Sequence, residues 1–156
     1  MCAIMPKDKN GNEANMKRIL YFAHPINTYD TELEQTLIAK IIRMFPDCVI
    51  ENPNQKKHRE GYRRWKKKTG NGMQYYFSEV LPFCDGGLYL PFRDGTWGAG
   101  VFGEAKFFVQ RNGTSWVWTI DAGALIRLVH LESVRALSVS ETRARVYDSK
   151  GVFLPY

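Results

Sequence analysis

Apolar and polar residues alternate along the first third of the chain in blocks that predict strand, helix and strand. A continuous apolar run at residues 18–23 predicts a buried strand. Residues 33–45 place apolar side chains at helical spacing, with Asp30 as the expected N-cap and Pro46 as the stop. Residues 48–50 then predict a second short strand, which a turn at 52–54 ends.

The same alternation continues through the rest of the chain. A helical period through 73–81 precedes a strand at 86–90, and a glycine-rich turn leads into a helix that ends at 112–113. The remaining expected elements are a strand at 115–120, a segment at 124–131 that favours strand over helix, a helix from a Ser138 and Glu141 capping box to about 149, and an apolar tail at 152–156. This order predicts a doubly wound, mainly parallel α/β sheet of the Rossmann-like or flavodoxin-like kind.

Length and composition indicate one soluble domain. We expect residues 1–15, which are polar and without apolar period, to be a disordered leader, and residues 16–156 to form the domain. No apolar stretch approaches the ~20 residues that span a bilayer, and the first residues lack the apolar region of a secretory signal, so we expect a cytoplasmic protein. Three cysteines without a C-x-x-C pair indicate neither a disulfide framework nor a zinc site.

The net charge of +6 is concentrated in one segment, residues 56–68. It holds eight Lys or Arg against one Glu, a local +7, which leaves the rest of the chain at 6 − 7 = −1. With Tyr62 and Trp65 interleaved, such a segment could bind phosphate or stack a base, although a solvated loop or helix face is the commoner explanation. A nucleic-acid-binding protein is therefore one alternative function.

Candidate chemistry lies in the loops that follow the strands. In a parallel sheet the carboxyl ends of the strands share one edge, so the loops at 21–29 and 91–100 and the segment around Asp121 are expected to converge. His24, Asn27 and Arg93 stand in these loops as candidate substrate-binding residues.

Glu104 is the most informative acidic residue. It stands one turn into the helix that follows Gly98 and Gly100, where the positive end of the helix dipole favours a carboxylate. Such a carboxylate can attack an anomeric carbon, and an ordinary solvent-facing helix Glu is the alternative. Asp85 precedes the strand at 86–90, so it is either a turn residue or, if burial raises its pKa, a general acid.

Over residues 17 to about 110 the chain resembles the nucleoside 2-deoxyribosyltransferases and the related 2′-deoxynucleoside 5′-phosphate N-hydrolases. The family's Y-x-A-G-P-like motif is matched by Tyr21 to Pro25, its aspartate before a central strand by Asp85, and its G-x-x-x-E helix by Gly100 and Glu104. The resemblance implies Glu104 as nucleophile, Tyr21 as the residue that positions it, Asp85 as acid, no metal or organic cofactor, and a homodimer or larger homo-oligomer.

Two positions depart from the family pattern. The family glycine before Pro25 is His24, which adds a titratable donor near the sugar. The position six residues before the nucleophile, aspartate in the transferases and serine in the nucleotide hydrolases, is Gly98, which favours a 5′-phosphorylated substrate held by backbone N–H groups.

These features predict an enzyme that cleaves or exchanges the N-glycosidic bond of a nucleoside or nucleoside 5′-monophosphate. Water as the acceptor would make it a hydrolase, and a second base would make it a transferase. A non-catalytic nucleotide-binding module of the same fold is the other alternative, because His24 and Gly98 also fit a site that has lost activity.

Overall fold

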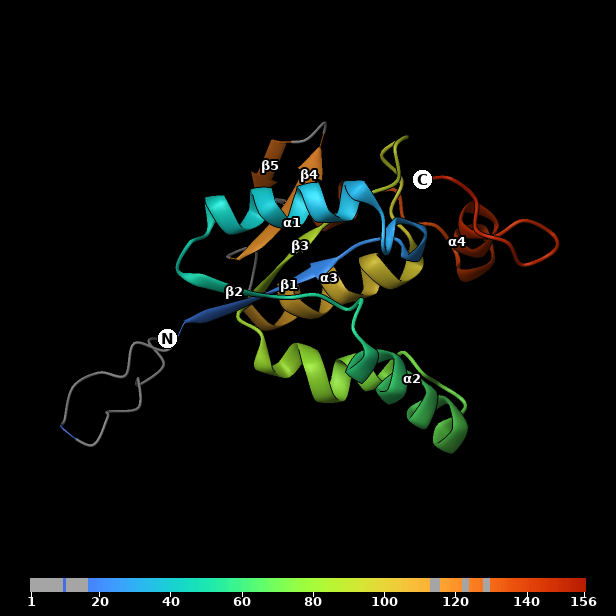
Figure 1. The fold of residues 1–156 in the computed structure, drawn as a ribbon, viewed down its shortest axis with the longest axis horizontal. Coiled ribbons are helices and arrows are strands. Elements are labelled where there is room, and N and C mark those ends of the chain that lie inside the picture. Colours follow the sequence, from blue (N-terminus) through green and yellow to red (C-terminus); the bar gives the residue numbers. More distant parts are fainter. Residues whose placement is uncertain (1–9, 11–16, 113–115, 122–123, 128–129) are drawn as a thin grey trace.

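Five strands form one sheet in the computed structural model, which describes residues 10, 17–112, 116–121, 124–127 and 130–156. The strands are β1 (Arg18–Ala23), β2 (Cys48–Glu51), β3 (Gly86–Tyr89), β4 (Val117–Asp121) and β5 (Ala124–Arg127), in the order β2-β1-β3-β4-β5. The first four run parallel, and β5 pairs antiparallel with β4 (Figure 1). The predicted doubly wound, mainly parallel α/β fold is confirmed.

Helices cover both faces of the sheet. They are α1 (Glu32–Met44), α2 (Lys56–Thr69), α3 (Ala99–Asn112) and α4 (Val139–Val146), with 3-10 helices at Ile26–Thr28, Leu81–Phe83 and Leu131–Ser133 and a π-helix at Tyr76–Val80. Figure 1 shows α1 on one side of the sheet and α3 on the other. None of the helices in the described ranges is long and apolar enough to cross a membrane.

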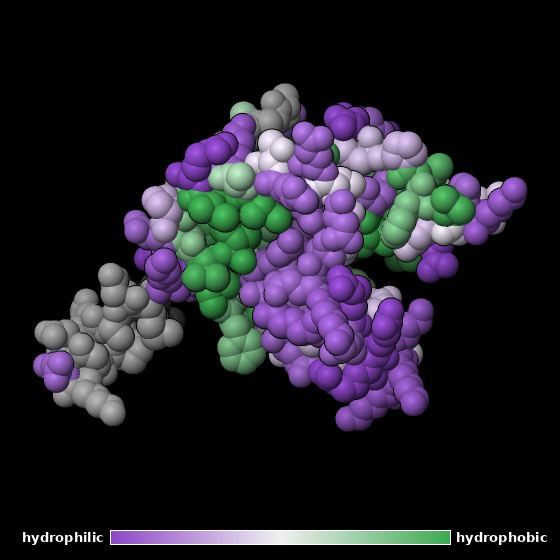
Figure 2. Space-filling model, viewed as in Figure 1, coloured by the Kyte–Doolittle hydropathy of each residue, from purple (hydrophilic) through white to green (hydrophobic). Residues whose placement is uncertain are grey.

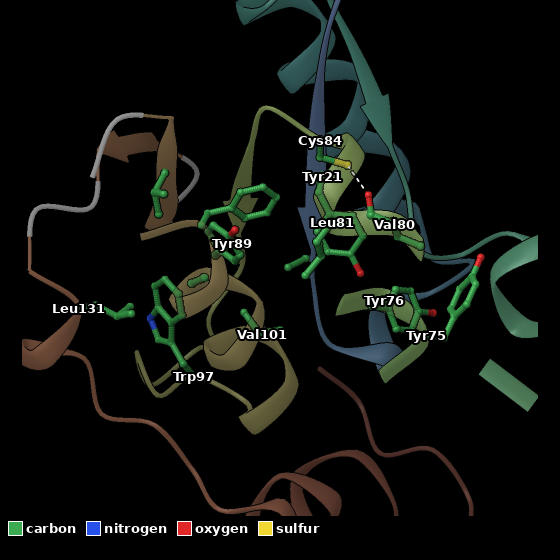
Figure 3. Close-up of a cluster of buried hydrophobic side chains, with 14 residues drawn as sticks. Tyr21, Tyr75, Tyr76, Val80, Leu81, Cys84, Tyr89, Trp97, Val101 and Leu131 are labelled. Carbon is green, nitrogen blue, oxygen red and sulfur yellow. Dashed lines mark hydrogen bonds between the residues drawn. The ribbon is translucent and has the colours of Figure 1, made fainter. Parts of the chain in front are cut away.

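The alternation of side chains along the buried strands divides the core between the two faces. Leu20 and Phe22 of β1 pack with Leu37 and Ile41 of α1 on one side. Tyr21 and Ala23 point the other way, into the larger cluster that also holds Tyr75, Tyr76, Tyr89 and residues of α3 (Figure 3). Because β1 is buried on both faces, its sequence is a continuous apolar run.

Several boundaries differ from the sequence prediction. Thr31, and not Asp30, caps α1, because Asp30 takes the left-handed conformation with φ 60° and the Thr31 hydroxyl accepts from the Glu34 N–H. The period at 73–81 folds into the π-helix and a 3-10 turn rather than one α-helix. Of the segment at 124–131, Ala124–Arg127 is strand, Leu131 begins a 3-10 helix, and residues 128 and 129 lie outside the described residues.

At the carboxyl end of the chain the predicted capping box is present, since Ser138 and Glu141 bond each other's backbone N–H groups. The helix α4 ends at Val146, before the predicted 149, and the chain then turns at Gly151 and folds back. The predicted leader at 1–15, apart from Asn10, and the predicted helix end at Gly113 lie outside the described residues.

Candidate active site

Glu104 is buried on α3, with 6% of its surface exposed, and faces the sheet. Its carboxyl group is hydrogen-bonded to the hydroxyl of Tyr21 on β1. Glu104 Oε1 lies 4.0 Å from where a Cβ on Gly100 would stand, so the missing side chain of Gly100 leaves room beside this oxygen. Within the described residues, Glu104 Oε2 has no hydrogen-bond partner.

The environment of Glu104 favours its uncharged form. Burial raises the pKa of the Glu104 carboxyl group to about 8, although the hydrogen bond from Tyr21 acts in the opposite direction. At pH 7 only about one Glu104 in ten then carries a charge. A buried carboxyl oxygen without a partner costs about 1–3 kcal/mol, and such a cost is characteristic of functional sites rather than of an optimised core.

Tyrosine side chains from four segments surround this carboxyl group. The four residues are Tyr21, Tyr29, Tyr76 and Tyr89. Burial raises the pKa of each of these hydroxyls, and the negative charge of Glu104 raises it further. The rings of Tyr21 and Tyr76 meet edge to face with centroids 6.3 Å apart, and both project into the cluster drawn in Figure 3. The candidate site is therefore one buried acid among aromatic side chains.

Among these tyrosines, Tyr89 carries a second polar atom without a partner in the described part of the chain, its hydroxyl oxygen. The ring of Tyr89 stacks on Trp97 at 5.7 Å and lies over Gly87, where an added Cβ would come within 2.3 Å of the hydroxyl. Gly87 therefore makes the space that this ring occupies, and two partnerless polar atoms belong to one buried group of side chains.

Arg59, in the first half of α2, contributes a positive charge to the site. Its charge lowers the pKa of both Tyr29 and Tyr76, against the larger effect of burial. One of its nitrogens, Nη1, donates to the Asn54 Oδ1 at 3.0 Å. Arg59, which the sequence did not single out, is thus an exposed residue of the basic segment whose charge acts on these two tyrosines.

His24, expected as a free donor near the sugar, is instead bonded at both ring nitrogens. Nδ1 lies 2.8 Å from the Phe22 carbonyl oxygen and Nε2 lies 2.6 Å from Glu34 Oε2. Burial raises the pKa of Glu34, but hydrogen bonds from His24 and Asn54 outweigh it and lower the pKa overall. His24 therefore joins the loop after β1 to α1 and has no ring nitrogen left for a ligand.

The segment at 131–156 covers the loops in which Asn27, Arg93 and Gly98 lie. Asn27 Nδ2 donates to the Leu154 carbonyl oxygen at 3.0 Å. Arg93 Nε donates to the Tyr156 carbonyl oxygen at 3.0 Å, and its guanidinium stands 4.6 Å from the centre of the Tyr156 ring. The carboxyl-terminal residues of this chain thus engage Asn27 Nδ2 and Arg93 Nε, whereas the buried Asn27 Oδ1 has no hydrogen-bond partner in the described residues.

Gly98 is a packing position under α4. A Cβ there would lie 3.2 Å from Thr142 Cγ2, and the neighbouring Ala99 N–H donates to Thr142 Oγ1 at 2.9 Å. A phosphate at the start of α3, as Gly98 led us to expect, would have to displace this hydroxyl. The structure therefore does not bring Gly98 into an open anion site.

Asp85 lies at the opposite edge of the sheet from these loops. It is exposed at the start of β3, where its Oδ2 accepts from the Ile19 N–H at 2.7 Å and its own N–H donates to the Ile19 carbonyl oxygen at 2.8 Å. The structure therefore does not place Asp85 with Tyr21 and Glu104, and its contacts are those of a residue that joins β1 to β3. Asp121, expected in the third converging loop, is exposed at the end of β4.

Comparison of the chain with models of protein families, with curated proteins and with solved structures finds no match. In the described ranges, no group of three His, Cys, Asp or Glu side chains could hold a metal ion. The arrangement of Glu104, Tyr21 and the surrounding tyrosines is thus the basis for a functional argument.

Proposed function

We propose that this chain cleaves or exchanges the N-glycosidic bond of a nucleoside or nucleoside 5′-monophosphate, with Glu104 as nucleophile. One observation carries the proposal: Glu104 is a buried carboxyl group, bonded on one side to Tyr21 and without a partner at Oε2 in the described residues. A nucleophile needs a fixed position and a free oxygen, and the group has both.

In the proposed reaction a Glu104 carboxylate oxygen attacks C1′ of the sugar. The C1′–N bond breaks with its electron pair on the base nitrogen, which takes a proton from solvent. The product is a glycosyl ester of Glu104, and water or a second base then attacks C1′ and releases the carboxylate. Tyr21 is a positioning residue that holds Glu104 through its hydroxyl.

The raised pKa sets a condition on this mechanism. Only the charged carboxylate attacks, and with a pKa of about 8 its charged fraction grows about tenfold between pH 7 and pH 9. The positive charge that develops on the sugar ring in the transition state stabilises the carboxylate as the reaction proceeds. Base release is therefore expected to increase with pH over this range.

For a 5′-monophosphate, Arg59 is the better supported ligand. Its charge acts on the tyrosines around Glu104, whereas Arg93 is engaged by Tyr156. A guanidinium group forms charge-assisted hydrogen bonds with phosphate oxygens. We therefore assign the phosphate to the side of the site that faces α2.

Access to Glu104 requires a movement of the segment at 131–156. This segment is tied to the edge by hydrogen bonds to Asn27 and Arg93, by the hydroxyl of Tyr156, which donates to the Pro91 carbonyl oxygen at 2.6 Å, and by an ion pair between Arg145 and Asp94. Most of these contacts are exposed or half-buried, and exposed ion pairs contribute little stability. Opening of this edge would break these polar contacts together with the apolar cluster that Phe92 forms with Leu137, Val146 and Tyr156.

A non-catalytic nucleotide-binding module is the second candidate function. It is favoured by the protonated state of Glu104 at neutral pH and by the covered edge of the sheet. Binding of nucleotides without any base release at pH 9 would support this candidate over the enzyme.

Self-association belongs to the same proposal. Exposed apolar side chains gather near the end of α1 and on the edge strand β2, where Figure 2 shows a continuous hydrophobic area. The residues are Ile42 and Met44 of α1 and Val49 of β2. Together with the outer edge of β2, which pairs with no strand in the described part of the chain, they offer a surface for a second copy of this chain. Light scattering on the wild-type protein and on Val49→Lys measures whether this surface forms an oligomer.

A panel of nucleosides and nucleoside 5′-monophosphates, with chromatography of the free base, tests the proposed activity. We expect base release by the wild type at pH 9, none above background by Glu104→Gln, and unchanged release by the control Glu132→Gln, whose side chain is exposed. Equal release by the wild type and Glu104→Gln would refute the role of Glu104.

A further inference from the structure

The helix α2 presents a cationic surface to solvent. Seen down its axis, Arg59, Arg63, Lys66 and Lys67 fall on one side of the helix, since Arg63 stands three or four residues from each of the others, and all four are exposed. We call these four residues the cationic stripe. Figure 2 shows that the helix that carries it is strongly hydrophilic over the visible face.

The charge of the stripe is not neutralised within the described part of the chain. Ion pairs of α2 and its surroundings use other residues: Lys56 with Glu60, Lys57 with Glu51, and Arg64 with Glu79. No stripe residue takes part in an ion pair there. Arg59 and Arg63, and Arg63 and Lys67, are moreover like charges four residues apart, a spacing that destabilises a helix.

The protein holds α2 firmly in spite of this repulsion. His58 on its inner face bonds the Tyr75 hydroxyl at 2.9 Å and the carboxylate of Glu51. Gly61 lets the helix approach so closely that a Cβ there would lie 2.3 Å from the Tyr75 ring. The inner face therefore fixes the orientation of α2 and leaves Arg63, Lys66 and Lys67 directed to solvent, with Arg59 at the start of the stripe bonded to Asn54.

We propose that the cationic stripe of α2 binds the phosphate backbone of a nucleic acid. The stripe spans eight residue steps, about 12 Å of helix, which corresponds to roughly three or four phosphates along one strand of a duplex. Four cations thus meet a similar number of anions. The positive charges of the stripe have no ion-pair partners in the described residues, and they repel one another. A bound polyanion relieves this repulsion, and this is the observation that supports a nucleic acid as the partner.

A nucleic acid fits this surface better than an anionic membrane. A helix that binds in a membrane interface buries an apolar face in the lipid. In α2 the less polar residues Gly61, Tyr62 and Trp65 are buried or half-buried against the domain, and the outer face carries only charged residues. The proposal concerns binding alone and does not depend on catalysis by Glu104.

The test measures the anisotropy of a fluorescein-labelled 20-base-pair DNA duplex of mixed sequence from 50 to 200 mM salt. With four phosphate contacts, the slope of log affinity against log salt is expected to be about −3 to −4. The triple variant Arg63→Gln, Lys66→Gln and Lys67→Gln should reduce the slope by about 3 units and the affinity at 100 mM salt at least tenfold.

The matched control removes two lysines and one arginine elsewhere, through Arg43→Gln, Lys106→Gln and Lys150→Gln, all at exposed positions outside α2. It should keep the slope of the wild type. An equal loss in both variants would show that only the total charge matters and would overturn the proposal. Tighter binding to vesicles with 30% phosphatidylserine than to the duplex, at equal phosphate concentration, would overturn it in favour of a membrane.

A measurement on the unaltered protein complements the variants. Bound duplex should protect Lys66 and Lys67 from acetylation, detected by peptide mass spectrometry, while Lys106 and Lys150 react at the same rate with and without DNA. Full reactivity of Lys66 and Lys67 in the complex would contradict binding through the stripe.

Discussion

Replacing Glu104 by Gln should make the stability of the protein much less dependent on pH. In the folded state burial raises the pKa of Glu104 to about 8, from the ordinary 4.5 of an exposed carboxyl group. A group whose folded pKa is raised favours folding in its protonated form, and this contribution is lost as pH rises through the folded pKa. Gln is close in shape, is always neutral, and keeps a hydrogen-bonding group for Tyr21.

The magnitude follows from the two pKa values. At 1.36 kcal/mol for each pKa unit, ionisable Glu104 lowers the free energy of unfolding, relative to a permanently neutral group, by about 3 kcal/mol at pH 7 and about 5 kcal/mol at pH 9. At pH 4.5 the difference is below about 1 kcal/mol. These values are a large part of the 5–15 kcal/mol that stabilises a typical domain.

Urea unfolding of the wild type and Glu104→Gln at pH 4.5, 7 and 9 measures this effect. The gap in free energy of unfolding between the two proteins should widen with pH in favour of Gln. The exposed control Glu132→Gln should show no such widening. A gap that is constant across the three pH values would refute the reasoning, because it would mean that Glu104 has an ordinary pKa.

Three further predictions follow from other contacts. Tyr156→Ala removes a hydroxyl hydrogen bond and a ring that hold the segment at 131–156 over the site, so base release should increase several-fold, and an unchanged rate would contradict the covering role. Arg59→Gln should abolish the preference for a nucleoside 5′-monophosphate over the matching nucleoside in calorimetric binding, and a retained preference would place the phosphate elsewhere. Gly61→Ala should destabilise the protein by about 1–3 kcal/mol in urea, since the new methyl group meets a tyrosine ring, whereas Gly103→Ala, with ordinary contacts at 3.6 Å, should not.

Hydropathy periods predicted the strands and the helices α1 and α3, because each of these elements buries one side or both. They did not predict α2, in which charged residues outnumber apolar ones and leave no clear apolar period. The boundaries that depend on single backbone conformations were less predictable. Asp30 and Thr31 are both good N-cap residues. Thr31 is the cap because the backbone of Asp30 takes the left-handed conformation, which the sequence does not reveal. The π-helix at Tyr76–Val80 keeps an apolar period close to that of an α-helix, so the pattern alone does not distinguish the two.

The candidate site was predictable where it rests on local motifs and not where it rests on packing. Tyr21 and Glu104 come from the motifs of the resemblance, and the structure brings them together. Tyr76 and Arg59 join them through the way α2 and the π-helix pack on the sheet, which no local pattern encodes. The one feature of the sequence that could have indicated Tyr76 is the recurrence of tyrosine at positions expected to be buried.

The loop residues show the same division. His24, Asn27 and Arg93 lie at the carboxyl edge of the sheet, as the convergence of loops predicts. The partner of His24 is Glu34 on α1, ten residues away, whereas the partners of Asn27 and Arg93 are Leu154 and Tyr156 at the far end of the chain. Long-range contacts of this kind depend on the complete fold, so the sequence left these three residues as apparent ligands.

The most direct test of Glu104 as the nucleophile is the mass of the protein after rapid acid quenching of a reaction with a deoxynucleoside or its 5′-monophosphate at pH 9. A glycosyl ester on Glu104 predicts an increase equal to the sugar moiety without its base, mapped by peptide mass spectrometry to the segment that contains Glu104, and absent in Glu104→Gln. Release of free base with an adduct on another residue, or with the same adduct in Glu104→Gln, would contradict the account.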